Sequence, residues 1–332
     1  MNTGGDAGQG AGGTAAGRIN VHHHFLPPAY MKAIEGRLAM GRGRQRSIGW
    51  SPAVDVEQMD AAGIALSIGS VSIPGIWFGD VAESRRLARE WNEYAAQVVH
   101  DHPGRFGFFA AVAPPDVDGS LSEIDYALDV LKADGIALMS SYDGRWLGDS
   151  LFRPVLAELN RRRAVVFVHP AALPETGTPE GIKSHVLEGP FDTTRTVFSL
   201  LRNGVLSECH GIRFIFAHGG GAIPYLAGRV ATLSHGGGAM APERIRELLG
   251  ALYFDTALTI NAPALAALTA FCPASHILLG TDSPILPPEA EIAVWRALAM
   301  DVDLRRAIER DNAAALLGIG ASKLSKLEVG TS

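Results

Sequence analysis

The sequence predicts a (β/α)8 barrel, or TIM barrel. Three observations predict it: short apolar runs recur eight times, helical patterns lie between them, and histidine or aspartate side chains stand at the ends of several runs. Strands that alternate with helices over roughly 300 residues are typical of this fold. An open doubly wound sheet is the alternative. No G-x-G-x-x-G motif follows the first run, which disfavours that sheet.

The eight runs are expected to be buried parallel strands. Most are apolar at consecutive positions and do not alternate between apolar and polar residues, as expected for strands that are covered on both faces. In chain order they span residues 18–23, 64–71, 106–112, 135–139, 164–168, 212–217, 252–255 and 276–279.

Helical periodicity is clearest in segment 83–99 and in the segment after Gly119, where apolar residues three and four apart fall on one face. Asp80 and Ser120 are the expected N-caps of these two helices. Further helices are expected at 152–162, 193–207, 263–271 and 288–299. Two long loops are expected after the first and fifth strands, at 36–52 and 171–190. A barrel places such loops on its catalytic face.

Composition excludes several classes of protein. The net charge of −6 disfavours a nucleic-acid binder, which normally presents a basic face. No apolar run approaches the roughly 18 residues of a membrane span. The two cysteines, Cys209 and Cys272, do not form a disulfide framework, so a reducing compartment and a cytoplasmic location are expected.

The domain organisation follows from the same patterns. Residues 1–17 are mostly Gly, Ala and small polar residues and lack the features of a signal peptide, so they are expected to form a disordered tail. Residues 18–320 are expected to form a single catalytic barrel domain, and residues 321–332 a C-terminal tail.

Five side chains at strand ends carry the chemical signal. His22 and His24 end the first strand, and their spacing of two points both imidazoles to the same side, with His23 pointing away. His169, His218 and Asp282 end the fifth, sixth and eighth strands. A single histidine in such a place is usually only a polar residue. Five together at the catalytic face predict a metal site, because imidazole nitrogens and a carboxylate suit a Zn²⁺-type ion.

Two short motifs that mimic hydrolase signatures are not expected to act as such. The stretch from Gly148 to Leu151 looks like a nucleophile block of one esterase class but is not at the first strand. The His218-Gly219-Gly220-Gly221 stretch looks like a lipase oxyanion loop, but its partner G-x-S-x-G is absent. These glycines are expected to let the backbone pass close to the metal pocket.

The chain resembles the amidohydrolase superfamily in its amidohydrolase-2 branch, from about Arg18 to Leu317. That branch includes aminocarboxymuconate-semialdehyde decarboxylase and the non-oxidative aromatic-acid decarboxylases. Within it the chain is most similar to the 6-methylsalicylate decarboxylases. The resemblance is carried by His22-His23-His24-Phe25-Leu26-Pro27, Phe167-Val168-His169-Pro170, Phe191-Asp192-Thr193-Thr194-Arg195, His218-Gly219-Gly220-Gly221-Ala222-Ile223-Pro224 and Gly280-Thr281-Asp282.

The resemblance implies one divalent metal ion, Zn²⁺ in first place and Mn²⁺ in second, held by His22, His24, His169 and Asp282. It implies that His218 orients or deprotonates the water on the metal. It also implies that Arg229 reaches into the neighbouring subunit's site and binds a substrate carboxylate, which requires a homodimer. An ordinary surface arginine is the alternative for Arg229.

Two positions depart from the family pattern. Asn20 stands where the family usually has Asp, two residues before the first ligand. Ser283 stands where an aromatic residue commonly follows the last Asp. The second change is expected to widen the pocket or to alter which ring fits, so it affects the substrate more than the metal.

Three functions are considered. The first is metal-dependent, non-oxidative decarboxylation of a small carboxylic acid, expected to be an aromatic ortho-hydroxy acid, with Asp282 or a water held by His218 delivering the proton. The second is hydrolysis of a lactone or cyclic amide by the same metal, with Asp282 taking the proton. The third is a non-catalytic barrel that serves as an oligomeric binding protein, against which the complete ligand set argues.

Candidate substrate residues lie in the loops. An arginine of the first long loop (Arg42, Arg44 or Arg46) is a candidate anion holder, with Arg46 chosen among them. A solvated basic loop is the favoured alternative. Phe191, Trp77 and Trp146 are candidates for the ring pocket, although aromatic residues more often serve in packing.

Overall fold

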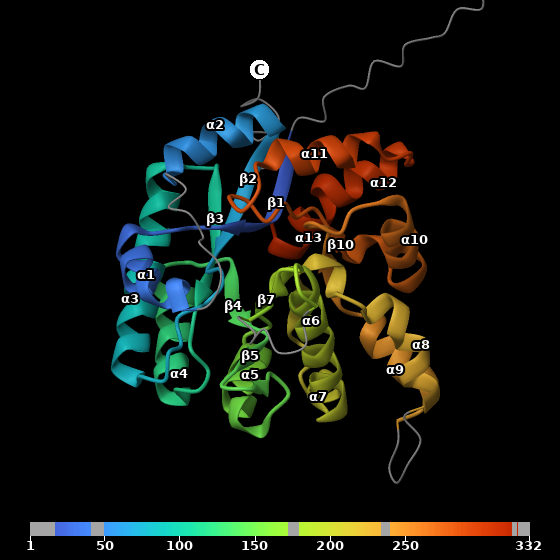
Figure 1. Ribbon diagram of the computed structural model, residues 1–332, viewed down its shortest axis with the longest axis horizontal. Coiled ribbons are helices and arrows are strands. Elements are labelled where there is room, and N and C mark those ends of the chain that lie inside the picture. The colour runs from blue at the N-terminus through green and yellow to red at the C-terminus, as the bar shows by residue number, and fades with distance from the viewer. Residues whose placement is uncertain (1–16, 41–49, 172–178, 234–239, 321–323, 325–332) are drawn as a thin grey trace, which may run out of the picture.

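The computed structural model describes residues 17–40, 50–171, 179–233, 240–320 and 324. The predicted barrel is confirmed: eight parallel strands form one sheet in the order β1-β2-β3-β4-β7-β8-β9-β10, surrounded by helices (Figure 1). The strands are β1 (Arg18–His24), β2 (Ile64–Ser70), β3 (Phe106–Ala111), β4 (Gly135–Met139), β7 (Val165–His169), β8 (Arg213–Phe216), β9 (Tyr253–Asp255) and β10 (Ile277–Leu278).

Backbone hydrogen bonds between β1 and the segment after β10 close the sheet. The Val21 amide donates to Leu279 O at 2.9 Å, and the His24 amide donates to Ser283 O at 2.7 Å. A parallel bridge also joins His23 to Ser283. Because the strands are parallel, their carboxyl ends all lie at one end of the barrel, where barrel enzymes build their sites.

Helices cover the outside of the sheet (Figure 1). They are α1 (Pro28–Met40), α2 (Pro52–Ala62), α3 (Val81–Asp101), α4 (Val117–Asp125), α5 (Arg153–Arg161), α6 (Ser184–Arg202), α7 (Val205–Glu208), α8 (Ile223–Leu233), α9 (Pro242–Gly250), α10 (Ala262–Phe271), α11 (Pro288–Ala297), α12 (Val302–Arg306) and α13 (Asn312–Leu317). Short turns of helix are η1 (Tyr126–Val130), η2 (Ser150–Phe152), η3 (His218–Gly220), η4 (Ala274–His276) and η5 (Ala307–Asp311). A small hairpin, β5 (Ser141–Tyr142) and β6 (Arg145–Trp146), follows β4.

The core fills the barrel and the layer between strands and helices. Phe108, Phe109, Phe167 and Phe216 on the strands are almost completely buried, and Trp91 of α3 packs in the same core. All residues of β1, β2, β3, β4 and β7 are buried, as the apolar runs predicted. No helix in the described ranges is long and apolar enough to span a membrane.

Several predicted element boundaries need correction. Asp80 caps α3 as expected, but Asp116, not Ser120, caps α4: its carboxylate accepts a hydrogen bond from the Gly119 amide, and Ser120 lies inside the helix. The helix begins at Val117, so the free amides of its first turn lie next to Asp116, and Ser120 comes too late to cap them. The sequence patterns did not predict α1, α2, α8, α9, α12 or α13.

The two predicted long loops are shorter than expected. The one at 171–190 ends at α6, which begins at Ser184 and continues through Pro190. The one at 36–52 lies between α1 and α2, and Ser51 caps α2 by accepting from the Val54 amide. Residues 41–49 lie outside the described part of the chain, as do residues 1–16 of the predicted N-terminal tail and most of the predicted C-terminal tail.

Candidate metal centre

The five predicted side chains converge at the carboxyl end of the barrel. One ligand atom from each of His22, His169, His218 and Asp282 lies within 4.8 Å of every other. His24 completes the group: its Nε2 lies 3.3 Å from His22 Nε2 and 2.9 Å from Asp282 Oδ1. The distance from His22 Nε2 to the same Asp282 oxygen is 3.0 Å. His22, His24, His169 and Asp282 are buried, and the His218 side chain is 11% exposed.

Each of three imidazoles is oriented by a hydrogen bond at Nδ1. His22 Nδ1 bonds to Asp255 Oδ2 at 2.8 Å, and His169 Nδ1 bonds to Pro170 O at 2.9 Å. His24 Nδ1 lies near Ser70, 3.2 Å from its hydroxyl and 3.4 Å from its carbonyl oxygen. A carboxylate or carbonyl partner fixes the proton on Nδ1, so the lone pair of Nε2 points into the cluster.

This arrangement fits a divalent cation. Two Nε2 acceptors and a carboxylate oxygen approach one another within 3.3 Å, and acceptors that face each other in a buried site need a positive charge between them. Three imidazoles and one carboxylate form the donor set that Zn²⁺ and similar ions prefer. His22, His24, His169 and Asp282 can therefore hold such an ion, with His218 beside it.

The pKa values of the cluster indicate the same need for positive charge. Burial lowers the pKa of His22, but the carboxylates of Asp255 and Asp282 outweigh it and raise that pKa to about 10. Burial and the neighbouring His24 and His22 hold the pKa of His169 well below its usual value. Burial raises the pKa of Asp282, yet the imidazoles of His22, His218 and His24 bring it well below its usual value. Without a cation, a proton on His22 therefore balances the carboxylates.

The backbone of the site adopts unusual conformations. His218 and Asp282 have φ values of 56° and 58°, in the left-handed region that residues with a side chain rarely enter. Gly219, Gly220 and Gly221 follow with positive φ. A Cβ on Gly220 would lie 2.6 Å from the Phe254 ring, and one on Gly221 would lie 2.1 Å from Pro190 O. These glycines therefore pass close to Phe254 and Pro190, and the expected close passage to the metal pocket stays a prediction.

Asp255 is a site residue that the sequence analysis missed. It ends β9, is fully buried, and accepts hydrogen bonds from the amides of His218 (3.0 Å) and Ala257 (2.9 Å) through Oδ1 while Oδ2 holds His22. One carboxylate therefore fixes both His22 and the start of η3. Its position at the end of the seventh strand could have revealed it, because the other site residues were predicted from their positions at the ends of four other strands.

The two departures from the family pattern both lie at the closure of the barrel. Asn20 donates from Nδ2 to Thr281 Oγ1 at 2.9 Å, and its Oδ1 accepts from the amides of His22 and Thr281, each at 3.1 Å. It therefore ties β1 to the segment that carries Asp282. Ser283 is buried, and its Oγ has no hydrogen-bond partner among the described residues.

The predicted substrate residues either have other hydrogen-bond partners or are exposed. Trp77 Nε1 donates to Asp143 at 2.7 Å, and Trp146 Nε1 donates to Asp192 at 2.8 Å. Phe191 is 39% exposed on α6, and Arg229 is exposed on α8. Their roles stay predictions. Arg42, Arg44 and Arg46 lie outside the described residues. His23 points away from the cluster as expected, with Nε2 2.7 Å from Asp55 Oδ2.

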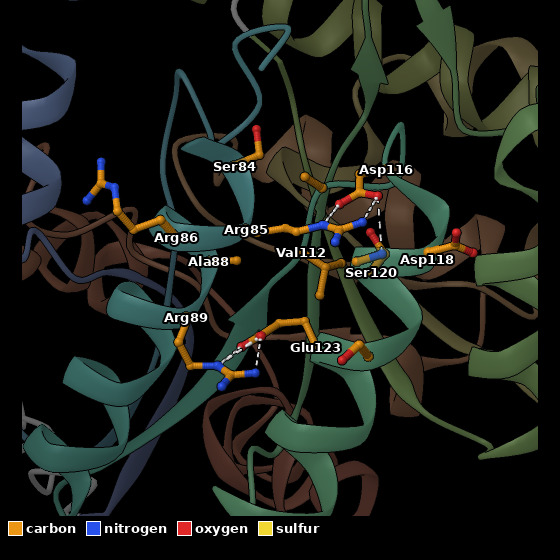
Figure 2. A pocket seen from close by; sticks show the side chains of 13 residues that line it. Ser84, Arg85, Arg86, Ala88, Arg89, Val112, Asp116, Asp118, Ser120 and Glu123 are labelled. Carbon is orange, nitrogen blue, oxygen red and sulfur yellow. Dashed lines mark hydrogen bonds and ion pairs between the residues drawn. The ribbon is translucent and has the colours of Figure 1, made fainter. Parts of the chain in front are cut away.

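A cleft of about 350 Å³ lies away from this cluster, between α3 and α4 on the outside of the barrel (Figure 2). Its two inner arginines are already paired: Arg85 with Asp116 at 2.8 Å and Arg89 with Glu123 at 2.9 Å. No catalytic group of the strand ends reaches it. The buried cluster, and not this cleft, is the candidate active site.

The fold and the cluster together define a (β/α)8-barrel protein with a site for one divalent cation at the carboxyl ends of its strands. The chain belongs to the Amidohydrolase family, which it matches over residues 19–319. This confirms the family that the motifs indicated.

Two proteins that are similar to this chain are named as decarboxylases. The chain is 37% identical over 290 residues to Decarboxylase macB of Penicillium terrestre, covering 82% of this chain and 85% of that protein. It is 36% identical over 296 residues to the 6-methylsalicylic acid decarboxylase acuB of Aspergillus aculeatus, covering 84% and 88%. A crystal structure of 5-carboxyvanillate decarboxylase from Novosphingobium aromaticivorans, complexed with manganese and 4-hydroxy-3-methoxy-5-nitrobenzoic acid, has the same fold. Its TM-score is 0.83 at 20% identity, covering 93% of this chain and 97% of that one.

Proposed function

We propose that this protein is a metal-dependent, non-oxidative decarboxylase of a small aromatic ortho-hydroxy carboxylic acid. One observation carries the proposal: a buried cluster of imidazoles and a carboxylate occurs in a chain 36% identical to a 6-methylsalicylic acid decarboxylase along most of its length. His22, His24, His169 and Asp282 are the proposed metal ligands.

The chemistry needs one proton and no water. An aromatic carboxylate takes up a proton at the carbon that bears the carboxyl group and then loses CO2, which restores the aromatic ring. A divalent cation, when bound, supplies electrostatic stabilisation of the carboxylate and of the neighbouring oxygen.

Asp282 and His218 are the proposed proton carriers. Asp282 Oδ1 faces His22 and His24, whereas Oδ2 lies 3.6 Å from His218 Nε2. The two oxygens therefore face different partners, and Oδ2 is free to exchange a proton with His218. The partial exposure of the His218 side chain gives this pair a route to solvent.

The choice between Zn²⁺ and Mn²⁺ belongs to the proposal. The set of three imidazoles and one carboxylate favours Zn²⁺. The 5-carboxyvanillate decarboxylase with the same fold has manganese in its crystal structure. We put Zn²⁺ first, with Mn²⁺ as the second candidate.

A direct assay separates decarboxylation from hydrolysis. The metal-loaded protein is given ortho-hydroxybenzoates, with 6-methylsalicylate first, and in parallel lactones and cyclic amides. The proposal expects CO2 release from an ortho-hydroxybenzoate, loss of that activity on chelation, and its return with added Zn²⁺ or Mn²⁺. Turnover of lactones or amides alone would show that the hydrolase alternative is correct. Protein that binds no metal and turns over none of these compounds would favour the non-catalytic binding protein.

We also propose that the enzyme is a homodimer in which Arg229 contacts a substrate carboxylate in the neighbouring subunit. Arg229 is exposed on α8 and has no ion pair within the described ranges of its own chain. Tyr225, at 87% exposure, and Leu233, at 60%, lie four residues before and after it. These three residues form a stripe on one face of α8. The helix itself lies at the lower right of the molecule in Figure 1. Exposed apolar residues around an unpaired arginine suit a subunit contact.

Subunit mixing tests this arrangement. Arg229→Ala and His169→Ala are each expected to abolish most activity. When both chains are coexpressed with different tags, each mixed dimer regains one complete site, so about a quarter of the wild-type activity is expected in a statistical mixture. Activity that does not exceed the sum of the two separate variants would contradict the shared site.

We place the protein in a reducing compartment, the cytoplasm. The thiols of Cys209 and Cys272 support this location, because both are free and buried.

A further inference from the structure

The carboxylate of Asp192 lies at the junction of three segments next to the metal centre. Asp192 is 1% exposed on α6. Its Oδ1 accepts from Trp146 Nε1 at 2.8 Å, and its Oδ2 accepts from the hydroxyl of Ser140. Weaker contacts of 3.4 Å reach the same Oδ2 from the Ser141 hydroxyl and the Ala171 amide. Both oxygens of the carboxylate are therefore engaged as acceptors.

Ser140 connects Asp192 to the main chain around His169. Its amide donates to His169 O at 2.8 Å, and its hydroxyl oxygen accepts from the Ala171 amide at 2.8 Å. The backbone is thus held on both sides of Pro170, whose carbonyl oxygen in turn holds His169 Nδ1 at 2.9 Å. The direction of the His169 imidazole depends on this segment.

We propose that Asp192 is a positioning residue, which fixes His169 for metal binding through Ser140 and holds Trp146 of the β5–β6 hairpin against α6. The chain of contacts runs from Asp192 to the Ser140 hydroxyl, then to the Ala171 and His169 main chain, and then to the imidazole. The inference rests on the proposed metal centre, because His169 is one of its proposed ligands.

The groups that donate to Asp192 determine which substitutions weaken its hydrogen bonds. An asparagine at 192 has the same size, but its NH2 group would face either the Ser140 hydroxyl or the Trp146 indole N–H, both of which donate. Loss of an orienting hydrogen bond behind a ligand typically lowers metal affinity by about 10- to 100-fold. Ser140→Ala removes the hydroxyl that joins Asp192 to the Ala171 amide and leaves only the 3.4 Å contact between that amide and Asp192 Oδ2. Ser141→Ala removes only the 3.4 Å contact to the same oxygen and is the matched control.

The experiment measures the Kd for Zn²⁺ and for Mn²⁺ by competition with a chromogenic chelator, without substrate, and the unfolding temperature of each metal-free variant. Asp192→Asn and Ser140→Ala are expected to bind metal about 10- to 100-fold more weakly, and Ser141→Ala within about twofold of wild type. If Asp192→Asn does not fold, Ser140→Ala decides the question alone.

Two other results would overturn the proposal, and they differ from each other. Unchanged Kd values in Asp192→Asn and Ser140→Ala, with only the unfolding temperature lowered, would make Asp192 a purely structural residue and leave the metal centre intact. A wild-type chain that binds neither ion would refute the metal centre and, with it, this role of Asp192.

Discussion

At the residue scale, the orientation of each imidazole depends on the group behind it. Asp255, Pro170 and Ser70 occupy the Nδ1 side of the three histidines, so each Nε2 faces the cluster. Asp255 supports two residues of the cluster, because the carboxylate that binds His22 Nδ1 also accepts a hydrogen bond from the His218 amide at 3.0 Å. These supporting groups decide the tautomers on which the metal site depends.

Replacing Asp255 by Asn tests its role. The amide retains the size of the side chain but removes the charge that fixes the His22 proton on Nδ1. Affinity for Zn²⁺ is expected to fall by about 10- to 100-fold, measured by chelator competition. Asp118→Asn, a change at an exposed aspartate on α4, is the control and should leave the affinity unchanged. Equal affinities in both variants would show that Asp255 does not support the site.

Glu291 is expected to make the stability of the folded protein depend on pH. It is 7% exposed on α11, its Oε1 accepts from the Leu258 amide at 3.1 Å, and burial raises its pKa to about 7. The folded state therefore favours the protonated acid more than the unfolded state does. The contribution of Glu291 to stability is fully present below the unfolded pKa of 4.5 and is lost as the pH rises through about 7.

Glu291→Gln should remove this pH dependence, because the neutral amide still accepts from the Leu258 amide. The free energy of unfolding of the metal-free variant is expected to match wild type near pH 4 and to exceed it by about 1–3 kcal/mol near pH 8, at about 1.4 kcal/mol per pKa unit. Urea unfolding at both pH values measures the difference. The same pH dependence in both proteins would refute a buried acid at 291.

At the element scale, α6 and the glycine turn after β8 are packed against each other. Pro190 lies inside α6 although it lacks the N–H that a helix interior uses. Its carbonyl oxygen accepts from the Thr194 hydroxyl, and Gly221 passes close to it. The sequence predicted a loop over residues 171–190. Tertiary packing against the turn that carries His218 allows the helix instead.

Gly221→Ala tests this packing. The new Cβ would meet Pro190 O, and the φ of +64° is unfavourable for alanine, so a loss of about 3 kcal/mol of stability is expected. Gly250→Ala is the control, since its Cβ would lie at an ordinary 3.5 Å from Phe271 O and a change within about 1 kcal/mol is expected. Urea unfolding compares them. Equal stabilities would contradict the close packing.

At the scale of the whole molecule, the barrel and the five strand-end side chains were predictable because both depend on short-range patterns. An apolar run followed by histidine or aspartate fixes the strand and places the side chain at its carboxyl end. Asp192 and Asn20 were not predictable in their roles, since their partners lie on distant segments: Asp192 contacts Ser140, and Asn20 contacts Thr281. The left-handed backbone of His218 and Asp282 likewise depends on packing and not on local sequence.

We propose that this site releases CO2 from an aromatic acid by protonating the ring carbon. The most direct measurement is the turnover of 6-methylsalicylate by the metal-loaded protein in D2O, followed by NMR and mass spectrometry, with chelated protein and preformed 3-methylphenol as controls. We expect 3-methylphenol with one deuterium at the carbon that carried the carboxylate, together with CO2. Unchanged 6-methylsalicylate and other ortho-hydroxybenzoates, with metal bound in the cluster, would contradict it.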